Sequence, residues 1–176
     1  DVTREAAIPQ DSGWSTGVSV VDINNDGLLD IYVCKVGKYE VLNSKNQFLI
    51  CKGIDKNGIP FYEDRALQYG LDFSGFSTQA LFFDYDLDGD IDMYLLNHAV
   101  HQNGSFAPRN NFIGTYSPLS GDRLFRNNTN SPSGGRGQEE TLFIDVTKEA
   151  GINSSSIGYG LGVVAADINL DGYPDL

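Results

Sequence analysis

The chain has 176 residues and a formal net charge of -12, from 24 acidic and 12 basic side chains. Hydrophobic residues make up 40% of it and aromatic residues 11%, which is too apolar for a disordered acidic tail and is enough for one domain with its own core. The acidic balance argues against nucleic acid as a partner, because binding to the phosphate backbone needs a basic patch. No window approaches the roughly 18 consecutive apolar residues of a transmembrane helix, so no membrane insertion by this segment is expected.

Short runs rich in β-branched and aromatic residues alternate with Gly, Asn and Asp in the first part of the chain. They lie at residues 18–21, 31–34, 48–51 and 60–62, and this composition predicts four short strands. A further strand at 93–96 is expected to pair with 123–126 across an inserted loop at 98–121.

The chain also repeats itself. Three segments align without gaps, each has the pattern D-x-[DN]-x-D-G-x-x-D, and an aromatic residue stands eight positions before each first Asp: Trp14, Phe76 and Tyr159. The repeats divide one domain, residues 1–176, into units at about 1–61, 62–142 and 143–176. Four strands per unit predict an all-β fold made of β-propeller blades, each a four-stranded antiparallel sheet. Since so few units cannot close a ring, we expect the chain to be a fragment of a longer propeller.

Each Asp-rich loop places oxygen ligands at alternate positions, and its Gly permits a sharp turn that directs the next carbonyl inward. Ca²⁺ fits such a loop best, because it accepts six to eight oxygens in flexible geometry, whereas Mg²⁺ demands a stricter octahedron. We predict three Ca²⁺ sites, formed by Asp22, Asn24, Asp26, the Leu28 carbonyl and Asp30; by Asp84, Asp86, Asp88, the Asp90 carbonyl and Asp92; and by Asp167, Asn169, Asp171, the Tyr173 carbonyl and Asp175.

The second site has the most carboxylates and is predicted to bind Ca²⁺ most tightly. The alternative of ordinary solvated Asp/Asn/Gly turns is disfavoured because three copies stand in register between strands. An EF-hand is also disfavoured, since the position of its bidentate Glu is occupied by Val33 and Leu95. Protein oxygens fill the predicted coordination sphere, which favours a structural metal over a Lewis acid that needs an open position.

The two cysteines, Cys34 and Cys51, end two of the predicted strands. A disulfide is conceivable if these strands form one hairpin. Two small buried thiols are the favoured interpretation, because disulfide geometry is demanding.

The inserted loop carries the remaining candidates for chemistry. His98, His101 and Arg109 are the only set that offers a base and a charge-neutralising group. Basic and aromatic residues in and around the same loop could form a binding patch. The alternative is that the aromatic residues simply anchor the loop. The residues concerned are Arg109, Arg123, Arg126, Arg136, Phe106, Phe112 and Tyr116.

The repeats resemble the FG-GAP/VCBS repeats of integrin-α-like β-propellers. Residues 14–24, 143–152 and 158–163 are most similar to large bacterial surface proteins with a downstream ASPIC/UnbV module, to which cartilage acidic protein is related. The resemblance implies a seven-bladed propeller, Ca²⁺ between the first two strands of a blade, and a secreted or cell-surface location, with the bacterial outer-membrane surface favoured. It also implies binding or adhesion more than catalysis.

The sequence thus predicts a calcium-stabilised propeller segment that serves as a binding or assembly scaffold. Its expected partners are other cell-envelope or extracellular proteins and glycans, met through loops such as 98–121. The alternative is the propeller part of a polysaccharide-degrading lyase or hydrolase.

Overall fold

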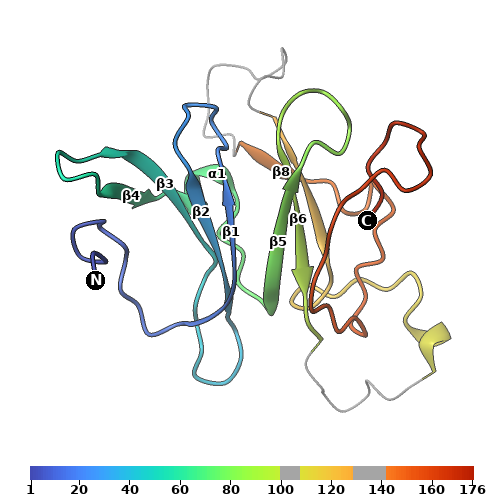
Figure 1. Ribbon diagram of the computed structural model, residues 1–176. Coiled ribbons are helices and arrows are strands. Elements are labelled where there is room, and N and C mark those ends of the chain that lie inside the picture. Colours follow the sequence, from blue (N-terminus) through green and yellow to red (C-terminus); the bar gives the residue numbers. More distant parts are fainter. Residues whose placement is uncertain (100–107, 129–141) are drawn as a thin grey trace, which may run out of the picture.

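The computed structural model describes residues 1–99, 108–128 and 142–176, and its secondary structure is almost entirely β (Figure 1). Two four-stranded antiparallel sheets follow one another along the chain, and each strand pairs with its neighbours in sequence. The first sheet contains β1 (Trp14–Val21), β2 (Asp30–Val36), β3 (Gln47–Ile54) and β4 (Pro60–Asp64); the second contains β5 (Ser77–Phe83), β6 (Asp92–Asn97), β7 (Arg123–Asn127) and β8 (Phe143–Asp145). The predicted all-β class and the four-stranded antiparallel sheets are confirmed.

Helical structure is limited to two short elements in the described part of the chain. These are α1 (Ala66–Tyr69) and the 3-10 helix η1 (Arg109–Asn111). Neither approaches the length or apolar character that crossing a lipid bilayer requires.

The four strands predicted in the first unit are all present, and β6 pairs with β7 as expected. A short element, in which an aromatic residue (Tyr62 or Phe143) is followed two positions later by an aspartate, precedes the second and third Asp-rich loops and lies in the last strand of the preceding sheet. It supplies β4 and β8, so the predicted boundary between residues 61 and 62 lies inside β4. In both copies an aspartate then caps the following turn, since Asp64 accepts from the Ala66 amide and Asp145 from the Thr147 amide.

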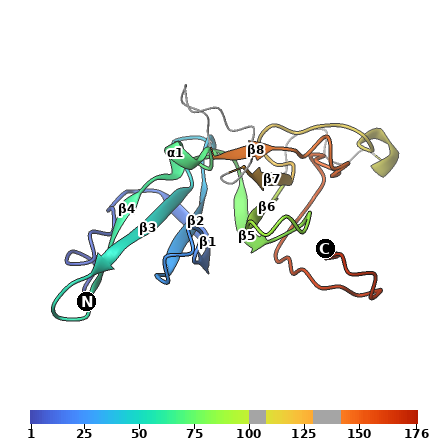
Figure 2. The same cartoon turned by 90° about the horizontal axis from the view of Figure 1, so that it is seen from above.

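The two sheets pack against each other through aromatic side chains, with β5 lying next to β1 and β2 (Figure 2). The rings of Tyr32 and Phe48 each lie 5.8 Å from Phe82 of the second sheet. Tyr32 and Phe48 are fully buried because side chains of β2 and β3 that point to this face meet the facing sheet. This contact builds the main hydrophobic core.

The same hydrogen bond joins successive units twice. The hydroxyl of Thr16 donates to the Ser77 carbonyl at 2.6 Å, and the hydroxyl of Thr78 donates to the Gly160 carbonyl at 3.1 Å. Backbone approach is close at this point, since a Cβ added to Gly17 would lie 2.1 Å from the Thr78 carbonyl oxygen. The segment around Gly160 therefore meets the second sheet as β5 meets the first.

The strand register keeps the two cysteines apart. Between β2 and β3 the aligned pairs run from Ile31 with Leu49 to Val33 with Gln47. Cys34 lies beyond one end of this stretch and Cys51 beyond the other. Both are free, buried thiols, as the favoured interpretation predicted.

Candidate metal centre

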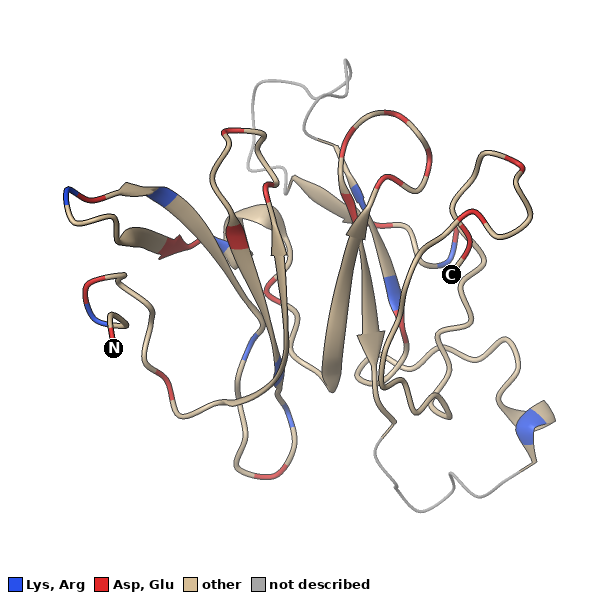
Figure 3. Ribbon diagram, viewed as in Figure 1, with Lys and Arg blue, Asp and Glu red and all other residues tan. Residues whose placement is uncertain are grey.

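The three Asp-rich loops lie at hairpin tips on one side of the molecule, and Figure 3 shows acidic residues in each of them. The first loop connects β1 to β2 and the second connects β5 to β6. The third is closed by a bridge between Ala166 and Asp175. This bridge matches the closing pairs Val21–Asp30 and Phe83–Asp92 of the other two loops.

The second loop brings three carboxylates together. Oxygens of Asp84, Asp86 and Asp88 all lie within 4.8 Å of one another, and Asp86 and Asp88 are exposed to solvent. Three negative groups so close repel each other unless a cation lies between them. A set made only of carboxylate oxygens fits a hard divalent ion. The structure thus brings together three of the five predicted ligands of this loop.

The first aspartate shapes the backbone of every loop. A side-chain oxygen of Asp22, Asp84 and Asp167 accepts a hydrogen bond from the glycine five residues later, at 2.9, 3.0 and 2.9 Å respectively. Those glycines have φ values of 82°, 92° and 90°. This region of φ disfavours residues with a side chain, which explains the glycine at this position of the pattern.

The fourth residue of each loop also has a left-handed backbone conformation. Asn25, Leu87 and Leu170 have φ values of 54°, 61° and 61°. For leucine this conformation costs on the order of 1 kcal/mol, so the same backbone is retained against its local preference. A single shape therefore recurs in three loops of different sequence.

The ninth residue ties each of the first two loops to its sheet. Asp30 and Asp92 are fully buried, and each accepts two backbone hydrogen bonds through its two oxygens. Asp92 accepts from the Tyr85 amide at 3.1 Å and from the Asn127 amide of β7 at 2.7 Å. Burial raises the pKa of Asp92 to about 6, and it also raises the pKa of Asp30.

This anchoring role was not predicted from the sequence, which treated Asp30 and Asp92 only as metal ligands. The signal available was their position directly before an apolar strand. A neutralising cation beside these buried carboxylates would lower their pKa values again.

The first and third loops differ from the second at their middle ligand position. Asn24 and Asn169 replace the central carboxylate there, and each donates an amide hydrogen bond of 2.9 Å to the next predicted ligand, Asp26 or Asp171. Two carboxylates and an amide carry less negative charge than the triad of the second loop. This difference agrees in direction with the predicted order of affinity, which remains a prediction.

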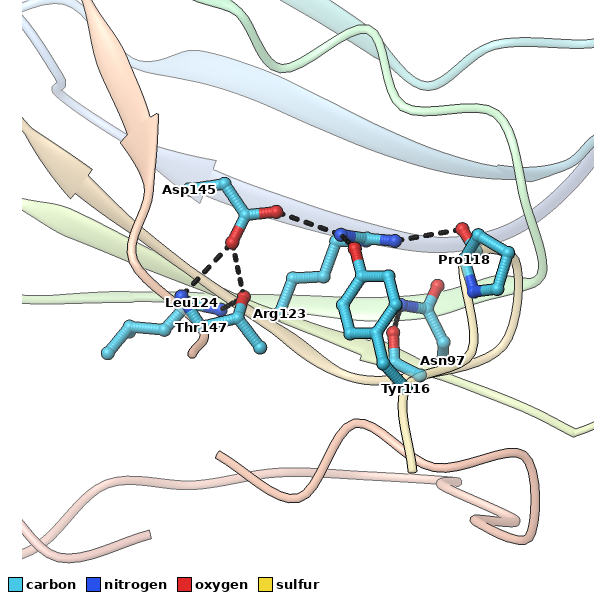
Figure 4. Close-up of polar contacts among 8 residues, drawn as sticks. Asn97, Tyr116, Pro118, Arg123, Leu124, Asp145 and Thr147 are labelled. Atoms are coloured by element: carbon cyan, nitrogen blue, oxygen red, sulfur yellow. Dashed lines mark hydrogen bonds and ion pairs between the residues drawn. The ribbon is translucent and has the colours of Figure 1, made fainter. Parts of the chain in front are cut away.

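The predicted patch of basic and aromatic residues contains an internal anchor at Arg123 (Figure 4). This side chain is only 7% exposed; its guanidinium donates to Asp145 and to the Pro118 carbonyl, both at 2.8 Å, and also contacts the Tyr116 hydroxyl. It lies 4.7 Å from the Phe73 ring centre and 5.1 Å from that of Tyr116. Arg123 thus holds the 116–118 segment against the second sheet, which supports the interpretation of an anchored loop. Phe106 and Arg136 of the predicted patch lie outside the described residues.

The proposed catalytic set is not assembled in the described part of the chain. The His98 ring packs edge-on against Tyr159, with ring centres 5.1 Å apart. Arg109 is exposed on η1, while His101 lies outside the described residues. The position of His98 fits a packing role.

Comparison with known proteins does not assign the chain to a family. No known protein family matches the chain, and no curated protein matches it in sequence. The loops and the sheets themselves therefore carry the functional information.

Proposed function

We propose that this chain is a calcium-stabilised β-propeller segment of a secreted or cell-surface protein, in which it acts as a binding or assembly scaffold. The supporting observation is the recurrence of one loop conformation, at equivalent hairpin tips, in all three copies of the D-x-[DN]-x-D-G-x-x-D pattern. A common backbone with a common set of oxygens is what a repeated ion site requires.

In this proposal, calcium stabilises the folded state. Eleven of the 24 acidic residues stand in the three loops, and their mutual repulsion opposes closure of the hairpin tips. An ion held by the predicted ligands of each loop offsets that repulsion, so its binding free energy adds to the stability of the folded state. The second loop, with its converging carboxylates, is the first to be occupied.

The same chemistry supports the proposed extracellular location. Extracellular calcium modules typically have dissociation constants of roughly 10⁻⁴ to 10⁻³ M, which suits exposed loops in a medium of millimolar calcium. Both cysteines are buried, which shields their thiols from oxidants in such a medium. Other cell-envelope proteins and glycans are the proposed partners.

Calorimetric titration of the metal-free protein with Ca²⁺, together with thermal melts in Ca²⁺ and in chelator, tests the structural role. We expect calcium binding and a higher melting temperature in Ca²⁺ than in chelator. Pull-down from envelope extracts and glycan libraries then tests the scaffold role. A melting curve that chelation leaves unmoved would contradict structural calcium, and the absence of any captured partner would contradict the scaffold.

A further inference from the structure

A cavity of about 820 Å³ opens on the first sheet, away from the Asp-rich loops. It lies between the N-terminal segment 11–13, the loop 41–47 and α1, and Asp64 and Asp72 complete its wall. This volume falls within the range of sites that bind small molecules. Nothing in the calcium-dependent role of the loops uses it.

The charges around the cavity are largely paired with one another. Asp11 accepts two hydrogen bonds of 2.8 Å from the buried ammonium group of Lys35, and Lys45 forms an ion pair with Asp72. Asp64 directs one oxygen to the backbone amides of Phe48 and Ala66. No cationic side chain on the wall is left to neutralise an anion, so a phosphorylated or carboxylated ligand is disfavoured.

Uncharged polar groups remain available. Ser12, Asn43 and Gln47 line the cavity, and their side chains make no hydrogen bond with any other residue that the structure describes. A hydroxyl group both donates and accepts, and a carboxamide does the same with its two ends. Such groups match ligand hydroxyls, which also donate and accept at the same atom.

Apolar groups form the rest of the wall. Val41 is 94% exposed and Leu67 is 73% exposed, although both line the cavity. Exposed aliphatic side chains beside neutral hydrogen-bonding groups suit a ligand with an apolar face and a polar edge. A pyranose ring has both, because its C–H groups lie on one face and its hydroxyls at the rim.

We propose that this cavity binds a neutral oligosaccharide, with Asn43 and Gln47 hydrogen-bonding its hydroxyls and Leu67 packing on a sugar ring. This proposal rests on the scaffold function proposed above and names one of its ligands and the place where it binds. It moves glycan recognition from the inserted loop to the first sheet.

The test is calorimetric titration of the calcium-loaded full chain with neutral hexasaccharides of glucose, xylose and mannose. A sulfated hexasaccharide and a lysine-rich peptide serve as charged probes. We expect at least one neutral sugar to bind and both charged probes to fail. The double variant Asn43→Ala/Gln47→Ala should weaken binding by about fivefold or more. The matched variant Asn111→Ala, on exposed η1 and outside the cavity, should leave binding unchanged.

Thermal melts of each variant establish that it is folded. If no neutral sugar binds while calcium still raises the melting temperature, the cavity proposal is wrong and the calcium-stabilised scaffold stands. If a sugar binds equally well to the double variant, its site lies elsewhere. Binding of the lysine-rich peptide or the sulfated sugar in place of neutral sugars would also overturn the proposal. If calcium has no effect, the proposed function fails independently of the sugar result.

Discussion

Replacing one carboxylate of the acidic triad should change stability in opposite directions with and without calcium. Asp86 is the best position, because it is exposed and no side-chain hydrogen bond ties it to the loop, whereas Asp84 and Asp88 both accept backbone amides. The substitution Asp86→Asn keeps the size of the side chain and removes its charge. It therefore isolates electrostatics from backbone geometry.

The magnitude follows from the distances within the triad. Two unit charges separated by 4.8 Å or less repel each other by about 0.9 kcal/mol or slightly more in water. Asp86 takes part in two such pairs, so its neutralisation should stabilise the metal-free protein by about 2 kcal/mol at low salt. Screening at physiological ionic strength should reduce this gain to about half.

With calcium present the effect should reverse. The variant replaces a charged carboxylate ligand with a neutral amide oxygen, as at Asn24 and Asn169, and a tenfold loss in affinity corresponds to about 1.4 kcal/mol of linked stability when calcium is in excess. Urea unfolding in chelator and in millimolar Ca²⁺, at two salt concentrations, measures both effects. Glu149→Gln is the charge-matched control, because Glu149 is exposed and lies outside the Asp-rich loops. Equal destabilisation of Asp86→Asn in both media would refute the reasoning.

Three further outcomes are expected. Among single ligand substitutions, Asp88→Ala should lower the melting temperature in Ca²⁺ most, because it removes a ligand of the triad and the acceptor of the Asp90 amide. Calorimetry in chelator should show a smaller drop in melting temperature. Burial raises the pKa of Asp92 to about 6, above its unfolded value of about 3.8, so the native state binds the extra proton. Metal-free stability should then fall by roughly 2 kcal/mol as pH rises from 4 to 7, and urea titrations that stay flat over this window would contradict it. Burial raises the pKa of Cys34 to about 12, so an aromatic disulfide reagent at pH 8 should modify neither Cys34 nor Cys51 until denaturant is added; rapid reaction of the native protein would disprove their burial.

Local patterns were sufficient for the strands and for the loops between them. Alternation of β-branched residues with Gly, Asn and Asp predicted β1 to β4, because strand preference and turn chemistry are decided within a few consecutive residues. The same holds for the loop containing Asp84, Asp86 and Asp88. Its glycine and its alternating carboxylates stand in one short segment, and their convergence needs no distant partner.

The roles of side chains whose partners are distant in sequence were decided only by the tertiary structure. The second oxygen of Asp92 accepts from the Asn127 amide, 35 residues away, and that partner exists only once β7 is aligned beside β6. Register likewise separates Cys34 from Cys51, which a hairpin of other alignment would have brought together. The guanidinium of Arg123 is paired and buried for a related reason, since its ring contacts come from Phe73 and Tyr116 on different segments. Sequence thus determined which short segments carry oxygen ligands and strands. Long-range pairing decided which polar groups became buried anchors, because burial and register are properties of the packed chain.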